Sequence, residues 1–287
     1  MSDYQIITDS SCDFPTADYE TYGLINVPLT VDFQGRIFDD VNDDSLKQMY
    51  DAFRTGGIAK TSAINPERWS NAMIPVLEAG KDVLVLAFSS GLSTTYQSAV
   101  IAGEDLKQRY PQRKIYVVDT LCASLGQGLL TWYACKKRDE GMDLDTLHTW
   151  VEENKLHLCH WFTVDDLMHL KRGGRISAST ALVGTMLNMK PVLHMDDEGH
   201  LISMSKVRGR RASIEALAKK AGELGAGYDN STMFISHGDC REDAEYLAKL
   251  LKENYGVKEV FINYVGAVIG SHTGPGVLAL FFLGKHR

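Results

Sequence analysis

The stretch DVLVLAFSSGLSTTYQS, residues 82–98, decides the fold, because it joins a buried strand to a polar turn and a helix start. Its apolar run, VLVLAF, lacks the alternation of a half-exposed strand, which predicts a strand buried on both faces inside a parallel sheet. A hydroxyl-rich turn follows, and a helix-like run begins at about Tyr96. Open α/β sheets bind ligands at the carboxyl ends of their strands, and free amides at a helix start favour an anion. The turn is therefore either an anion site or a helix cap formed by Ser93 or Thr94.

Composition places the chain among ordinary globular proteins. It has 287 residues, of which 44% are hydrophobic and 23% charged, enough for one large or two medium domains. The net charge of -7 argues against a nucleic-acid-binding protein with a broad basic face. The apolar runs are too short to span a bilayer, and the N-terminus lacks the pattern of a secretory signal, so we expect a cytoplasmic protein.

The residues that usually bind metals or nucleotides show none of the familiar spacings. The five cysteines are odd in number and include no CxxC pair, which favours reduced thiols over a disulfide framework. Histidine and acidic residues lack zinc-like spacing, so we expect no metal site. No phosphate-binding loop or dinucleotide fingerprint is present, and we expect no cofactor.

The order of predicted elements divides the chain into two halves. Strands and helices alternate up to about residue 154, the pattern of a doubly wound, mainly parallel α/β sheet. The second half inserts a hairpin, residues 191–194 and 201–207, among crossover helices, which predicts a mixed sheet covered by helices. We therefore expect two α/β domains, residues 1–163 and 164–287, with no low-complexity linker between them.

Three hydroxyl-bearing pairs need a common explanation: Thr61-Ser62, Ser93-Thr94 and His272-Thr273. The last pair precedes Gly274-Pro275-Gly276, which predicts a tight turn before the final strand. Together the three pairs could hold an anion through hydrogen bonds. Alternatively, His272 could activate Ser93 in an esterase or thioesterase, with Asp9 or Asp119 orienting the imidazole. The turn lacks the second glycine of a GxSxG elbow, so we rank the esterase second.

Basic residues gather in two segments of the second half. Lys171, Arg172 and Arg175 belong to one segment, and Lys206, Arg208, Arg210 and Arg211 to the other. They form either a solvated surface or a face for an acidic partner or a phosphate.

With these motifs in order along its length, the chain resembles the DegV family of bacterial proteins. The resemblance rests on five motifs: Thr8-Asp9-Ser10, Thr61-Ser62, residues 89–93 (SSGLS) with residues 95–99 (TYQSA), residues 170–176 (LKRGGRI) and residues 272–276 (HTGPG).

The resemblance implies a long-chain fatty acid bound between two α/β domains, and no catalytic activity of the chain itself. It implies that Thr61, Ser62, Ser93, Thr94, His272 and Thr273 hold the carboxylate. It also implies that this protein presents the acid to a separate ATP-dependent fatty acid kinase, which forms an acyl phosphate for phospholipid synthesis. The arginines of the basic segments, Arg172, Arg175, Arg208, Arg210 and Arg211, would then be the docking face for that kinase. A regulatory protein that merely contains an apolar ligand is a third possibility.

Overall fold

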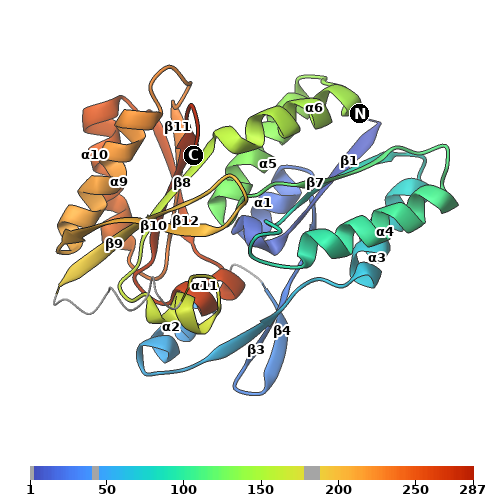
Figure 1. Ribbon diagram of the computed structural model, residues 1–287. Helices are drawn as coiled ribbons and strands as arrows, with labels where there is room; N and C mark the ends of the chain where they lie inside the picture. Colours follow the sequence, from blue (N-terminus) through green and yellow to red (C-terminus); the bar gives the residue numbers. More distant parts are fainter. Residues whose placement is uncertain (1–2, 41–44, 178–187) are drawn as a thin grey trace.

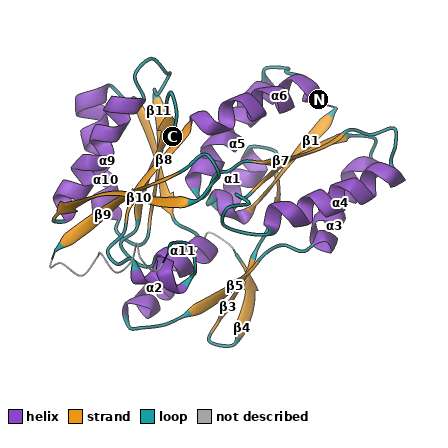
Figure 2. Cartoon of the chain, viewed as in Figure 1, coloured by secondary structure: helices purple, strands orange, loops and turns teal. Residues whose placement is uncertain are grey.

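The protein, seen here as a computed structural model, is described over residues 3–40, 45–177 and 188–287 (Figure 1). Within these residues the strands form a four-stranded, a six-stranded and a three-stranded sheet (Figure 2). None of the helices in this part of the chain combines the length and the apolar composition that a membrane span requires.

The four-stranded sheet is parallel throughout. Its spatial order is β2 (Ile25–Val27), β1 (Tyr4–Asp9), β6 (Asp82–Ala87) and β7 (Ile115–Asp119). Alternate side chains of β6 enter different cores: Leu84 and Leu86 face one side, and Val83 and Val85 face the other. The prediction of a central strand buried on both faces is thus confirmed.

The six-stranded sheet is mixed, as the sequence predicts. Its spatial order is β10 (Leu201–Arg208), β9 (Met189–Met195), β8 (Leu158–Thr163), β13 (Leu278–Leu283), β11 (Thr232–His237) and β12 (Glu259–Tyr264). Only β11 and β12 are parallel, and the other neighbours pair antiparallel. Because β8 pairs with β9 and β13, the change of sheet occurs before residue 158. The domain division near residue 163 stays a prediction.

The third sheet is a small antiparallel one that projects beside the first. It consists of β4 (Arg36–Asp39), β3 (Thr30–Phe33) and β5 (Ala59–Ser62), in that order. Strand β5 ends with the Thr61-Ser62 pair, so this sheet carries one of the three hydroxyl pairs toward the centre of the molecule.

Helices cover the outer faces of both large sheets and fill the space between them. The longer helices are α2 (Leu46–Arg54), α3 (Pro66–Glu78), α4 (Thr95–Arg109), α5 (Leu125–Asp139), α6 (Leu144–Asn154), α9 (Arg210–Leu224) and α10 (Arg241–Tyr255). The short ones are α1 (Thr16–Thr21), α7 (Met168–Arg172), α11 (Ala267–Thr273) and the 3₁₀ turns η1 (Ser10–Cys12) and η2 (Lys155–His157). Helices α3 and α4 lie outside the first sheet, and α9 and α10 outside the second (Figure 1). Helix α5 packs between the sheets, against β8, β11 and β13, so one core joins the two halves.

The strand order creates a switch point between β1 and β6. From β1 the chain proceeds outward to β2, whereas from β6 it proceeds in the opposite direction to β7. Crevices at such points, beyond the carboxyl ends of the strands, are where open α/β sheets bind ligands. The turn after Phe88 lies at this place.

The segment that contains His272 is a helix that we did not predict. Residues 267–273 form α11, and His272 lies in its last turn. The predicted turn begins only at Gly274, whose φ of +74° ends the helix in a backbone region that glycine adopts without strain. The run from Val265 to Thr273 is short and mixes small with apolar residues, so the sequence shows no helical periodicity there.

Candidate functional site

A cavity of about 460 Å³ lies between the two large sheets, beyond the carboxyl ends of β6 and β7. Its size falls within the range of roughly 300–1,000 Å³ that small-molecule sites occupy. The apolar part of its wall comes from both halves of the chain: Leu29, Ala63, Phe88, Leu92, Ala123, Phe162, Leu170, Met195, Leu201, Val265, Val268, Ile269, Val277, Ala279 and Phe281. The cavity is therefore suited to an apolar molecule.

The structure brings all six predicted carboxylate-binding residues to this cavity. They are Thr61 and Ser62 at the end of β5, Ser93 and Thr94 in the turn after β6, and His272 and Thr273 at the end of α11. Ser62 and Thr94 are exposed, whereas Thr61, Ser93 and His272 are half-buried and Thr273 is buried. The exposed pair places this polar end of the cavity at the protein surface.

Hydrogen bonds fix the inner members of this polar group. The Oγ1 of Thr61 lies 2.8 Å from Nε2 of His272, and Ser93 Oγ lies 2.9 Å from Thr95 Oγ1. Ser93 Oγ also accepts a hydrogen bond from the Thr95 amide at 3.2 Å, whereas the N-cap residue of α4 is Thr94, which makes no capping side-chain hydrogen bond. The Ser93 hydroxyl still has capacity for a further partner.

His272 is a neutral hydrogen-bonding group at physiological pH. Burial, assisted by the nearby charge of Arg175, lowers the pKa of His272 to about 4. A neutral imidazole can donate one hydrogen bond and accept another, without contributing a charge.

Arg175 adds a positive charge that the sequence did not lead us to expect here. We expected it on a docking face, but it lines the cavity wall. Its guanidinium donates to the carbonyl of Leu92 at 3.0 Å and to that of Gly173. Burial lowers the pKa of Arg175, yet guanidinium groups stay charged in proteins. The polar end of the cavity thus combines hydroxyls, a neutral imidazole and one cation, a set that suits a carboxylate.

Residue 173 has no room for a side chain, because the imidazole of His272 packs against it. A Cβ at residue 173 would overlap Nδ1 of the imidazole, while the φ of Gly173, -71°, is ordinary for any residue. We expect Gly173→Ala to displace the His272 ring and to weaken carboxylate binding about tenfold, the value of one hydrogen bond to a charged group. Titration calorimetry with a long-chain acid measures the effect.

A double variant provides the control for this prediction. If Gly173→Ala acts through the ring, adding it to His272→Ala should cause no further loss of affinity. Additive losses in the double variant would contradict this explanation.

A second polar group lies in the same cavity, and we did not predict it from the sequence. Ser124 and Ser236 line the wall with His160, and the two serine hydroxyls lie 2.8 Å apart. Ser124 lies between β7 and α5, so the rule that singled out the turn after β6 could also have identified it, whereas Ser236 lies within β11 of the mixed sheet and is outside that rule.

The geometry does not assemble the catalytic triad of the esterase hypothesis. His272 Nε2 is engaged with Thr61, and Ser93 Oγ with Thr95. Asp9 accepts hydrogen bonds from the amides of Ser11 and Phe88, and Asp119 from those of Ser90 and Leu121. Both candidate acids thus serve to hold backbone turns.

The remaining arginines of the predicted docking face differ in exposure. Arg172, Arg208 and Arg211 are exposed, and Arg211 pairs with Glu215 at 3.1 Å. Arg210 is half-buried and pairs with Asp243 at 2.8 Å, so it also serves to tie α9 to α10.

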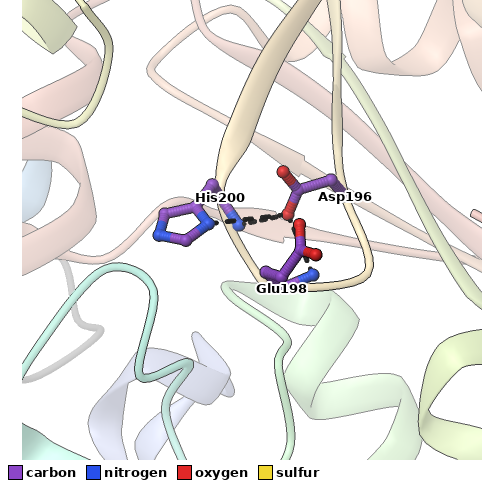
Figure 3. Close-up of side chains that lie close together, drawn as sticks. All are labelled: Asp196, Glu198 and His200. Atoms are coloured by element: carbon purple, nitrogen blue, oxygen red, sulfur yellow. Dashed lines mark hydrogen bonds and ion pairs between the residues drawn. The ribbon is translucent and has the colours of Figure 1, made fainter.

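The hairpin between β9 and β10 closes over the turn after β6. Ser89 Oγ donates to the carbonyl of Gly199, at the hairpin tip, at 3.0 Å. The tip also carries Asp196, Glu198 and His200, whose potential ligand atoms lie within 4.8 Å of one another (Figure 3). Asp196 Oδ1 accepts hydrogen bonds from the backbone amides of Glu198 and His200. The hairpin turn itself therefore explains why these three side chains lie close together.

Comparison with known proteins identifies the family. The model of a family described as "Uncharacterised protein, DegV family" matches residues 3–285. A DegV domain-containing protein of Clostridium perfringens is 43% identical over 100% of this chain and 99% of its own length. A fatty-acid-binding DegV family protein from Thermus thermophilus superposes with a TM-score of 0.87 at 32% identity, covering 98% of this chain and 99% of that one. A stearic-acid-binding protein from Eubacterium ventriosum superposes with a TM-score of 0.88 at 25% identity, covering 98% of each chain. The resemblance seen in the motifs is confirmed, and the chain belongs to the DegV family.

Proposed function

We propose that this protein binds a long-chain fatty acid, with the carboxylate at the polar end of the cavity and the alkyl chain along its apolar wall. The proposal rests on one observation: a polar group and an apolar wall meet within a single cavity. Thr61, Ser93, His272 and Arg175 lie at one end of a cavity whose other walls are mostly apolar. The fatty acids bound by the Thermus and Eubacterium relatives support the same ligand class.

The energetics favour such a ligand. Each methylene group that leaves water contributes about 0.8 kcal/mol, so a long chain supplies most of the binding free energy. A buried carboxylate is costly unless it is hydrogen-bonded and paired. The hydroxyls of Thr61 and Ser93 and the charge of Arg175 meet both requirements.

We further propose that the protein presents the acid to a separate ATP-dependent fatty acid kinase in the cytoplasm. The chain has no nucleotide-binding motif, and exposed Ser62 and Thr94 bring the carboxylate end to the surface. Exposed Arg172, Arg208 and Arg211 would contact the kinase. The five cysteines, all free, support a reducing compartment.

A reconstituted reaction tests this role. Acid-loaded protein, mixed with the catalytic subunit of a bacterial fatty acid kinase, Mg²⁺ and ATP, should yield acyl phosphate, which hydroxylamine traps as the hydroxamate. Arg172→Glu and Arg211→Glu should reduce the rate at least tenfold, because reversed charges repel an acidic partner. The same variants should bind the acid as the wild type does.

Two outcomes would contradict the kinase role. The first is a loaded protein that supports no acyl phosphate formation with any such kinase. The second is release of free acid from acyl esters by the protein alone, which would revive the esterase hypothesis.

A further inference from the structure

The second polar group of the cavity is buried, and within the described residues it shares no hydrogen bond with Thr61, Ser93 or His272. Ser124 and Ser236 are 5% and 0% exposed, and their hydroxyls come from opposite halves of the chain. Apolar residues such as Val265, Ala123 and Phe281 line the wall around them. An unsubstituted alkyl chain offers these hydroxyls nothing to bind.

The two polar groups are linked to opposite ends of helix α11. Ser124 donates to Asp13, and Asp13 accepts the amide of Gly266, the residue before the helix, at 2.9 Å. His272 follows six residues later, at the other end of the helix. With a rise of about 1.5 Å per residue, Gly266 and His272 lie about 9 Å apart along the helix axis, a length that a carbon chain spans with at least about six bonds. The serine pair is linked through Asp13 to the Gly266 end of the helix, so we expect it to face the middle of a long chain rather than its carboxylate.

The serine pair retains hydrogen-bonding capacity toward the cavity. Ser124 connects Asp13 to Ser236, and within the described residues the Ser236 side chain has Ser124 as its hydrogen-bond partner. A hydroxyl can donate one hydrogen bond and accept two, so capacity remains at Ser236. Burial raises the pKa of Asp13, but in either protonation state the chain of hydrogen bonds ends at Ser236 with an unused donor or acceptor.

His160 does not use this capacity. Its Nδ1 lies 2.9 Å from the carbonyl of Leu158, and its Nε2 accepts the amide of Ala123 at 3.3 Å. Both nitrogens of this buried imidazole are therefore occupied.

The backbone of Ser124 has a conformation that glycine adopts more easily than serine does. Its φ of 56° and ψ of -150° lie close to a region that is almost restricted to glycine. A glycine at residue 124 would meet the requirement of the turn, so what the serine contributes is its side chain.

We propose that Ser124 and Ser236 form a subsite for a hydroxyl group in the middle of the chain, so that the cavity accepts hydroxylated long-chain acids. The proposal rests on the function proposed above. A mid-chain hydroxyl would donate a hydrogen bond to Ser236, and it would be buried with that hydrogen bond made.

Matched ligands test the subsite. Competition binding with octadecanoic acid, its 10-hydroxy and 12-hydroxy forms, and its 2-hydroxy form as a positional control should be measured on the wild type and on Ser236→Ala, Ser124→Ala and Ser124→Gly. The wild type should bind at least one mid-chain hydroxy acid no more than about threefold weaker than octadecanoic acid. Each variant should weaken that ligand about tenfold relative to octadecanoic acid, the loss of a buried hydrogen bond. Ser124→Gly relieves the backbone while removing the hydroxyl, and should melt higher than Ser124→Ala, which keeps the backbone strain and loses the same hydrogen bonds.

The outcomes separate this subsite from the proposed function. A wild type that binds octadecanoic acid but rejects every mid-chain hydroxy acid overturns the subsite alone. Variants that weaken the plain and hydroxylated acids equally also overturn the subsite alone. A wild type that binds none of these acids overturns both proposals.

Discussion

Arg175→Met is expected to weaken the binding of a long-chain fatty acid by about 30- to 5,000-fold. The variant removes the only cation that lines the described cavity wall and leaves the ligand carboxylate partly buried without a charged partner. Truncating one member of such a pair costs about 2–5 kcal/mol, much of it from the charge left behind. Titration calorimetry at constant ionic strength measures the loss.

A neutral ligand and a neighbouring arginine provide the controls. The corresponding alcohol lacks the carboxylate, so its affinity should change little in Arg175→Met. Arg172→Met, at an exposed residue three positions earlier, should bind both ligands as the wild type does. Equal losses for the acid and the alcohol would mean that Arg175 only supports the wall through its bonds to Leu92 and Gly173.

The second large effect is expected at Gly91, in the turn after β6. A Cβ there would lie 2.6 Å from the carbonyl oxygen of Gly199 and 2.8 Å from that of Glu198, both backbone atoms. The hairpin tip would have to move, and Met195 and Leu201, which line the cavity, would move with it. We expect Gly91→Ala to cost about 1–3 kcal/mol of folding free energy, as overpacking does, and to release bound acid faster. Urea denaturation and ligand release kinetics measure these two effects.

Thr94→Ala is the matched control for Gly91→Ala. Thr94 is exposed in the same turn and its side chain makes no capping hydrogen bond to α4. Its substitution should leave the stability within about 0.5 kcal/mol of the wild type. Gly91→Ala with unchanged stability and release would show that the hairpin does not close the cavity.

The sequence was most informative where local rules and the fold agree. The unbroken apolar run of residues 83–88 favours a strand buried on both faces, and such strands are typical of parallel sheets. Parallel strands end at the same edge, so the polar turns after β1 and β6 had to lie together. That Thr61-Ser62 and His272-Thr273 reach the same edge was implied by the resemblance to the family. No local sequence pattern indicated it.

The residues that the second half contributes to the cavity could not be derived from the sequence in the same way. Arg175 lies three residues from exposed Arg172, and charge alone does not distinguish a cavity wall from a surface. Ser236 enters the cavity because β11 pairs antiparallel with β13, a register set by contacts distant in sequence. Helix α11 is too short for a visible period, and it is held by Asp13 and Asp40, which accept the amides of Gly266 and Val268.

Mass spectrometry of the lipid extracted from the purified protein decides whether this chain is a fatty-acid-binding protein. We expect an equimolar amount of a long-chain carboxylic acid, and a clearly lower amount in the double variant Ser93→Ala/His272→Ala. Wild-type protein that carries no long-chain acid, and that takes up none when it is supplied, would contradict the proposed function.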